Sequence, residues 1–242
     1  MNFKLFIKET TAVMDEFSLN NLSMPNIEYE LNEKIHAIII NPYLTWDNFN
    51  FNCDLIRKHS IRNVSTSLNF LSHLKKSLGN YKANINALIS YPFADLPIYF
   101  IEEFSCYAKD QGANGIEYTP NFFNLSKNNL DAFADELEKV QISRLPVTVI
   151  INKAKLEKEV FQKSIKISIE LGIKNFQFGD GFGPPISSLD VNEILKMTSN
   201  QNVIKIVGGI KKLNQIIDLF DLGVNCVGTS NFCEIFEEVK VI

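Results

Sequence analysis

The feature that most constrains this 242-residue sequence is an alternation between short β-branched runs and longer stretches with helical spacing of their apolar residues. Stretches such as LDAFADELEKV and LNQIIDLF predict helices. The runs that predict strands are HAIII (36–40), RNVSTS (62–67), ANINALIS (83–90), NGIEYT (114–119), PVTVII (146–151), KNFQFG (174–179), NVIKIV (202–207) and NCVGTS (225–230). Strand–helix alternation favours a parallel sheet covered by helices, and eight units are what an α/β chain of the (β/α)8 TIM-barrel type needs.

An open doubly wound sheet is the competing architecture, but no glycine-rich dinucleotide fingerprint follows the first predicted strand. The length and the 45% hydrophobic content suit one full-sized core. We therefore predict a barrel over residues 32–242. The segment 1–31, with FKLFI and then polar NNLSMPN, is interpreted as an N-terminal helical extension that covers one end of the barrel.

Composition narrows the classes of partner. The net charge of −4, without a basic stripe, argues against nucleic acid, and no apolar run approaches the roughly 20 residues that cross a bilayer. The cysteines form no CxxC pair and the chain opens with charged NFKLFIKET, which favours a cytoplasmic protein with reduced thiols. The histidines are dispersed, so we expect no metal site and no cofactor; they are His36, His59 and His73.

A weak internal repeat sets the phase of the strands. QGANGIEYT, LGIKNFQFG and LGVNCVGTS each place a glycine at a helix end before a strand, where a left-handed cap forms easily. Because strand side chains alternate faces, the fifth residue after each glycine should project equivalently: Glu117, Gln177 and Gly228. HSIRNVSTS adds Ser65 in the same phase. The pattern favours a polar pocket at the carboxyl ends of the strands, although barrel interiors also hold polar groups as structure.

Two glycine motifs at consecutive strand ends predict a phosphate site. In KIVGGI, Gly208 and Gly209 allow backbone N–H groups to approach an anion. In VGTSN, the residues Gly228, Thr229 and Ser230 offer further N–H and hydroxyl donors. Barrels commonly bind phosphate after their last two strands, where both motifs fall. The structural alternative for both motifs is tight turns and helix caps.

With these motifs, the chain resembles the deoxyribose-phosphate aldolase family. The matching segments are FQFGDGFGPP, SSLDVNEILK, IKIVGGI and GVNCVGTSN, in the family's order of lysine strand, glycine loop, KxxGGI and GTS. Upstream, IHAIIINPYLT, ALISYP and GANGIEYT resemble the first, third and fourth strands, so the likeness runs from about Ile35 onward.

The resemblance implies a class I aldolase that reversibly cleaves a C–C bond of 2-deoxyribose 5-phosphate through a lysine Schiff base. The expected ligand is a phosphorylated sugar or aldehyde, and a homodimer is among the expected assemblies. Lys205 matches the second family lysine and Glu117 the acidic residue, whereas Gln177 stands at the Schiff-base position. An amide cannot form an iminium with a carbonyl carbon. Two further positions differ from the family pattern. His36 stands where the first strand of the family has an acidic residue, and Asn152 stands where the fifth strand has a glutamate.

Three interpretations of the function are open. We favour a binding or regulatory pseudoenzyme. The alternatives are a lyase whose amine has migrated to Lys205 or Lys153, and a phosphosugar isomerase with Glu117 as base. Asp180 within GDGFG is interpreted as a turn former rather than a catalytic group. Because a lone ammonium is costly to bury, Lys205 in its apolar strand should pair with Glu117 or a bound anion.

Overall fold

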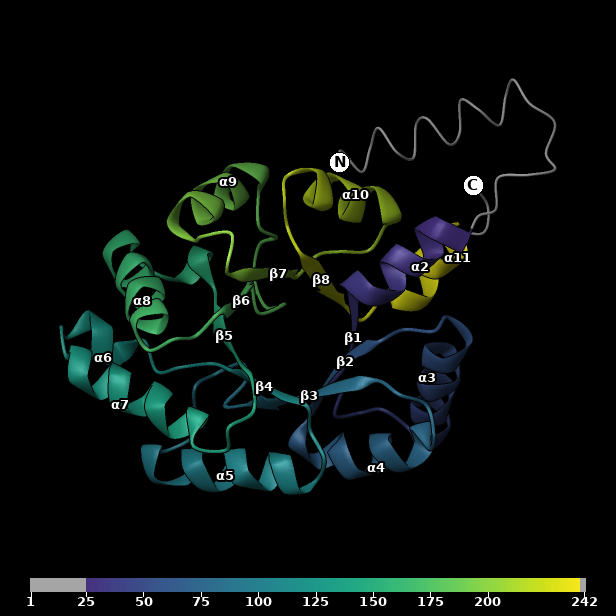
Figure 1. Ribbon diagram of the computed structural model, residues 1–242, viewed down its shortest axis with the longest axis horizontal. Helices are drawn as coiled ribbons and strands as arrows, with labels where there is room; N and C mark the ends of the chain where they lie inside the picture. Colours follow the sequence, from purple (N-terminus) through teal and green to yellow (C-terminus); the bar gives the residue numbers. More distant parts are fainter. Residues whose placement is uncertain (1–24, 240–242) are drawn as a thin grey trace.

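The computed structural model describes residues 25–239, in which parallel strands close into the barrel β1-β2-β3-β4-β5-β6-β7-β8 (Figure 1). The strands are β1 (Ile35–Ile39), β2 (Asn63–Ser67), β3 (Asn84–Ile89), β4 (Gly115–Tyr118), β5 (Val147–Ile151), β6 (Asn175–Phe178), β7 (Val203–Val207) and β8 (Cys226–Thr229). Each strand begins and ends within one residue of its predicted run. The predicted TIM barrel is therefore confirmed.

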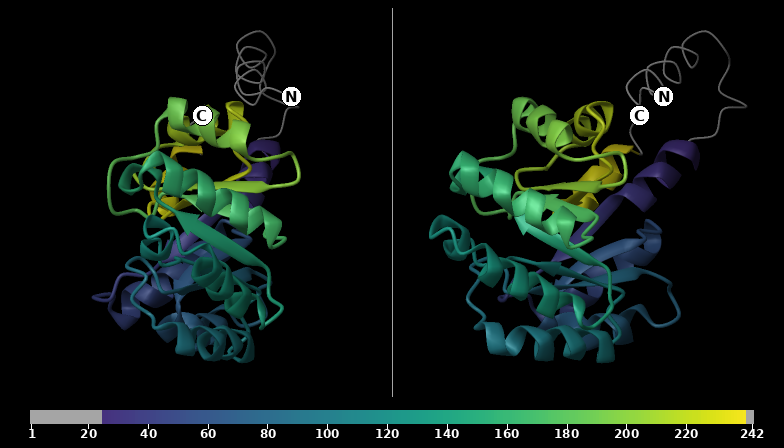
Figure 2. Two further views of the ribbon diagram at one scale, coloured as in Figure 1. Left: turned by 90° about the vertical axis from the view of Figure 1, so that its left-hand side faces the viewer. Right: turned by 60° about the vertical axis from the view of Figure 1, so that its left-hand side comes forward.

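Helices surround the ring of strands on the outside, as the views from the side also show (Figures 1 and 2). They are α3 (Trp46–Lys58), α4 (Leu68–Leu78), α5 (Ile98–Asp110), α6 (Phe123–Ser126), α7 (Leu130–Gln141), α8 (Lys158–Glu170), α9 (Ser188–Met197), α10 (Leu213–Asp221) and α11 (Phe232–Val239), with a 3-10 turn η1 (Lys153–Lys155) after β5. Within residues 25–239, no helix has both the length and the apolar character needed to cross a bilayer.

The helix α2 (Pro25–Lys34) precedes the barrel and runs directly into β1. Leu31 is fully buried, and the Asn32 carbonyl accepts a hydrogen bond from the Arg62 N–H at 3.0 Å, just before β2 begins. These contacts tie α2 to the amino-terminal end of the barrel. The predicted extension over residues 1–31 lies mostly outside the described residues, and its predicted boundary at residue 32 falls inside α2.

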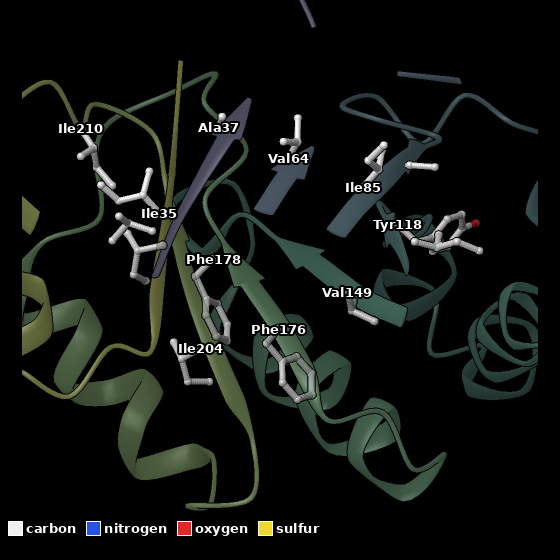
Figure 3. Packing of buried hydrophobic residues seen from close by; sticks show 14 of the residues in the cluster. Ile35, Ala37, Val64, Ile85, Tyr118, Val149, Phe176, Phe178, Ile204 and Ile210 are labelled. Carbon is white, nitrogen blue, oxygen red and sulfur yellow. The ribbon is translucent and has the colours of Figure 1, made fainter. Parts of the chain in front are cut away.

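The main hydrophobic core lies between the strands and the helices. Figure 3 shows part of it, with Ala37, Val149, Phe176 and Ile204 among the labelled side chains, and these residues are at most 1% exposed. Burying one of the larger of these side chains stabilises the fold by about 1.5–3 kcal/mol. Since successive side chains of a strand point to opposite faces, the residues between these apolar ones face the barrel interior. The interior is therefore free to carry polar groups.

The glycine caps take the predicted backbone conformation. Gly112, Gly172 and Gly223 have φ angles of +85°, +80° and +103°, and Ser60 takes the same role with φ of +53°. A left-handed residue ends each helix and lets the chain enter the next strand. The repeated cap explains why Glu117, Gln177, Gly228 and Ser65 share one phase along their strands.

Candidate active site

A buried ion pair spans the barrel interior from β7 to β4. The Lys205 Nζ atom lies 2.6 Å from Glu117 Oε1, and the two side chains are 3% and 1% exposed. The Ser65 hydroxyl of β2 donates to the same Glu117 oxygen at 2.7 Å and accepts from Lys205 Nζ at 3.1 Å. The predicted pairing of Lys205 with Glu117 is thereby confirmed, and the phase assigned to Ser65 is confirmed with it.

Two further inward-facing side chains surround the Glu117 carboxylate. Asn86 of β3 donates its amide N–H to Glu117 Oε1 at 3.3 Å, and His36 Nδ1 of β1 lies 3.9 Å from that oxygen. The other oxygen, Glu117 Oε2, has no hydrogen-bond partner within the described part of the chain. All polar contacts of this carboxylate thus converge on one oxygen, from four different strands.

The electrostatics of the cluster keep Glu117 ionised. Burial alone raises the pKa of the Glu117 carboxyl, but the Lys205 ammonium and the contact with His36 outweigh burial and lower that pKa to about 2. For His36, burial first and the nearby Lys205 second lower the imidazole pKa. The interior therefore contains an ionised carboxylate in an ion pair with Lys205, beside an imidazole whose pKa is lowered.

Gln177 occupies the position at which the resemblance leads one to expect the Schiff-base lysine. It is the register partner of Lys205 on the neighbouring strand β6, and it is 1% exposed. Its amide Nε2 donates to the Gly179 carbonyl at 3.1 Å, while Oε1 has no partner among the described residues. Position 177 thus points into the barrel beside Lys205 and carries an amide there.

The mouth of the barrel contains a cavity of about 500 Å³ at the carboxyl ends of β1, β7 and β8. Its walls are residues 38–41, 207–211 and 228–232, with Leu44, Asn52, Tyr91, Gly181 and Phe182. All the residues predicted to bind phosphate line this one cavity: Gly208, Gly209, Gly228, Thr229 and Ser230. Within residues 25–239, no acceptor receives the backbone N–H groups of Gly208, Gly209 or Ser230. These donors are available to an anion.

The three residues predicted to be catalytic lie below this cavity rather than on its wall. Ile38 and Val207 follow His36 and Lys205 by two positions on the same inward faces, and they line the cavity in place of the ion pair. At Gly228, a Cβ atom would lie 2.7 Å from Val207 Cγ2 and 2.9 Å from Lys205 Cε. Gly228 therefore makes room for the Lys205 stem and the apolar cover above it.

The GDGFG loop after β6 crosses the mouth and is held by its neighbours. The Asp180 carboxylate accepts from the Phe182 N–H two residues on at 2.9 Å, which is the turn-forming role predicted for it. It also accepts from Asn152 Nδ2 at 2.7 Å and pairs with Lys155 Nζ at 2.8 Å. The Tyr91 hydroxyl donates to the Asp180 carbonyl. Tyr91 and Lys155 were not predicted from the sequence as partners of this loop, because only the closed ring of strands brings the β3 and β5 loops to the β6 loop.

Lys153 does not reach the barrel mouth. Its ammonium contacts Asp190 and lies 2.6 Å from Glu193, both on α9. Partial burial alone lowers the pKa of Lys153, but its hydrogen bonds to these carboxylates outweigh burial and raise that pKa. Lys153 is therefore a surface ion-pair residue, and the lysine of this turn that faces the mouth is Lys155. His59 stacks on Phe236 and His73 meets Trp46 edge-on, both away from the cluster.

The fold and this arrangement define a (β/α)8 barrel with a glycine-loop cavity over a buried lysine–carboxylate pair. No family model matches the chain. Deoxyribose-phosphate aldolases of Mycoplasma capricolum and Gloeobacter violaceus are 20% and 23% identical to it over 216 and 214 residues, covering 86% and 87% of the chain and 96% and 94% of those proteins.

Solved structures give the same result for the fold. The aldolase QR15 aligns with a TM-score of 0.81 and 20% identity, over 87% of this chain and 96% of that one. The tetrameric deoxyribose phosphate aldolase of Aeropyrum pernix aligns with a TM-score of 0.75 and 16% identity, over 88% and 92% of the two chains. The chain is thus a divergent relative of the deoxyribose-phosphate aldolases, and the resemblance seen in the sequence is confirmed.

Replacing one member of the ion pair should lower the free energy of unfolding far more than expected from the effect of replacing both members together. We expect Glu117→Gln and Lys205→Met each to lower the free energy of unfolding by about 3–5 kcal/mol, because each leaves a buried polar partner unpaired. The double variant Glu117→Gln/Lys205→Met should lose much less than the sum, measured by urea unfolding. The exposed pair Lys166–Glu170, with nitrogen and oxygen 3.8 Å apart, is the control, and Lys166→Met should change stability by less than about 1 kcal/mol. Additive single effects at the buried pair would contradict the coupling.

The same pair predicts a pH dependence of stability. The folded-state pKa of Glu117 is about 2, below its usual value of 4.5, so the carboxylate contributes stability above about pH 4.5. That contribution is lost as the pH falls from about 4.5 through about 2. The free energy of unfolding of the wild type should therefore fall more steeply over this window than that of the double variant. Equal slopes in urea titrations at stepped pH would mean that Glu117 is not ionised in the fold.

Proposed function

We propose that this chain is a phosphosugar-binding barrel of aldolase ancestry that lacks ordinary deoxyribose-phosphate aldolase turnover. The observation that carries the proposal is Gln177, whose amide lies at the Schiff-base position beside Lys205. The lone pair of an amide nitrogen is delocalised into its carbonyl, so it does not attack an aldehyde carbon. The role we favour is binding or regulation.

The state of Lys205 supports the same proposal. A Schiff base forms only from a neutral amine, and Lys205 is an ammonium in contact with Glu117 and Ser65. Ile38 and Val207 separate it from the cavity. Substrate would have to displace both the ion pair and the apolar cover to reach the nitrogen.

The cavity supports a phosphorylated ligand. Its N–H donors at Gly208, Gly209 and Ser230 have no acceptor within the described residues, and α11 begins at Phe232, so its amino-terminal end adds a positive dipole there. Lys211 also lines the cavity and adds a cation. We therefore propose that the phosphate of a small sugar or aldehyde binds in this cavity.

An active lyase that uses Lys205 is the second candidate, favoured by the register that places Lys205 next to position 177. An isomerase with Glu117 as base is weaker, because a carboxylate with a pKa of about 2 has little driving force to take a proton from a carbon acid. A homodimer stays a prediction, and the tetrameric assembly is stated only for the Aeropyrum protein.

Reductive trapping separates binding from turnover. Incubation with 2-deoxyribose 5-phosphate and cyanoborohydride, followed by peptide mass mapping, should leave Lys205 unmodified, because its ammonium is paired and covered. The exposed Lys166 gives the background level of labelling. A stoichiometric adduct on Lys205 together with measurable cleavage of the sugar phosphate would instead establish the lyase.

The companion variant restores the amine. Gln177→Lys places a lysine beside Lys205, whose positive charge should lower the pKa of the new amine and favour its reactive neutral form. We expect trapping at position 177 that is absent from the wild type. Absence of trapping in a folded Gln177→Lys variant would show that the site has been remodelled for another kind of ligand.

Phosphate binding is tested by a matched pair of glycine substitutions. Gly208 and Gly223 have φ angles of +106° and +103°, so replacement by alanine strains the backbone at both positions, by about 1–2 kcal/mol. Only Gly208 lies on the cavity. Gly208→Ala should therefore weaken binding of 2-deoxyribose 5-phosphate and inorganic phosphate about tenfold or more by calorimetry, while Gly223→Ala leaves both unchanged. Equal affinities in the two variants, or no binding by the wild type, would contradict the phosphate site.

A further inference from the structure

An open groove lies on the outside of the barrel between α10 and α11. It has a volume of about 630 Å³; residues 212–214 and Ile217 line it from the α10 side, and three glutamates line it from α11. Leu213 is 3% exposed and Ile217 is partly buried against the core, so the floor of the groove is apolar. The Leu213 N–H donates to the Glu238 carboxylate at 2.8 Å and joins the two sides. The groove shares no residue with the cavity at the barrel mouth.

The border of the groove is acidic. Its lining holds Glu234, Glu237 and Glu238 against the single cation of Lys212. Within residues 25–239, none of these glutamates forms an ion pair with a lysine or an arginine. Glu234 and Glu238 stand four residues apart on α11, so they project from the same side of that helix. The groove therefore suits an apolar segment that carries two cations at the same spacing.

The chain contains such a segment before α2. The 24 residues that precede α2 lie outside the described part of the chain, and their only lysines are Lys4 and Lys8 in NFKLFIK. These lysines are four residues apart, which places them on one face of a helix, the structure predicted for this extension. Phe3, Phe6 and Ile7 would then form the adjoining apolar face. The sequence thus combines the apolar surface and the charge spacing that the groove requires.

The segment can reach the groove of its own chain. At the end of α2, Lys34 Nζ lies 5.2 Å from the centre of the Phe220 ring on α10, one turn beyond Ile217. Because a helix of this length spans about 14 Å, Pro25 lies at most roughly 35 Å from the groove. Residues 9–24 span up to about 55 Å when fully extended. The connection is therefore long enough.

A competing surface of similar chemistry lies on α5. A smaller groove there is lined by Glu103, Phe104, Cys106, Tyr107 and Asp110. In Figures 1 and 2, α5 lies across the ring of strands from α10. The contact between Lys34 and Phe220 ties α2 to the α10 side instead, so the groove between α10 and α11 is the one closer to the start of α2.

We propose that residues 3–8 bind, within the same chain, in the groove between α10 and α11. Lys4 and Lys8 pair with Glu234 and Glu238, and the apolar face of the segment covers the floor of the groove. The linker holds the segment at an effective concentration on the order of millimolar, so that individually weak contacts suffice. This docking goes beyond the proposed phosphosugar site and does not depend on it.

The test uses a water-soluble carbodiimide on the full chain at low protein concentration. The reagent joins an ammonium directly to a carboxylate that it contacts, so it reports ion pairs. Peptide mass mapping of the monomer should find Lys4 or Lys8 joined to a glutamate of α11. The surface pair Lys163–Glu159, whose nitrogen and oxygen are 2.7 Å apart, is the positive control for the reagent.

A matched pair of variants tests whether the pairing depends on the groove. Ile217→Lys replaces part of the apolar floor with a cation that repels the incoming lysines, and it should lower the yield of these cross-links about fivefold or more. Ile142→Lys introduces the same side chain at a 47% exposed isoleucine just after α7, away from the groove. This control should leave the yield unchanged.

The proposal is overturned if the control pair cross-links and neither Lys4 nor Lys8 is joined to α11. It is equally overturned if these lysines are joined to Glu103 or Asp110 of α5, or if the cross-links connect two chains. An unchanged yield in Ile217→Lys would also overturn it. Cross-links to α11 within one chain, lost in Ile217→Lys and kept in Ile142→Lys, support it.

Discussion

The ion pair between Lys205 and Glu117 is the constraint on which the barrel interior depends. An ammonium and a carboxylate taken out of water each lose several kcal/mol of hydration, and only close contact with additional hydrogen bonds offsets that loss. The structure supplies both, through Ser65 and Asn86 on Glu117 and through the space left at Gly228 for the lysine stem. Side chains from four strands, and the space left by one glycine, thereby accommodate a single ion pair.

This requirement for pairing explains how the amide at position 177 affects the balance of charge in the barrel interior. With lysines at both 177 and 205, the cluster would hold two cations against one carboxylate, since His36 is held neutral by burial and by Lys205. Such an excess of like charge is what makes one of two neighbouring amines lose its proton and react. With Gln177, the charges balance and the remaining ammonium is satisfied. Under the proposed function, the absence of a second lysine at position 177 would both balance these charges and remove the reactive amine, as expected where stability and activity compete.

The sequence predicted the parts of this arrangement that depend on periodicity. Eight β-branched runs set the strands, and the left-handed glycines fixed their phase closely enough to bring Glu117, Ser65 and Lys205 together. It did not predict contacts between loops. Lys153 and Lys155 stand two residues apart in the same turn, and only the turn geometry directs one to α9 and the other to Asp180. The cover formed by Ile38 and Val207 was missed as well, because apolar residues near a strand end carry no sign of what lies beneath them.

The division of the mouth follows from the same loop contacts. Asp180 stays in place because its carboxylate is fully used by Asn152, Lys155 and the Phe182 N–H, and Tyr91 then fixes its carbonyl. The loop held in this way separates N–H donors over β7 and β8 from a smaller cavity with an apolar wall over β3 to β6. An anion favours the environment of the N–H donors. Position 177 lines neither cavity. Under the proposed function, recognition at this mouth would therefore rest on backbone and loop geometry and would not require an amine at position 177.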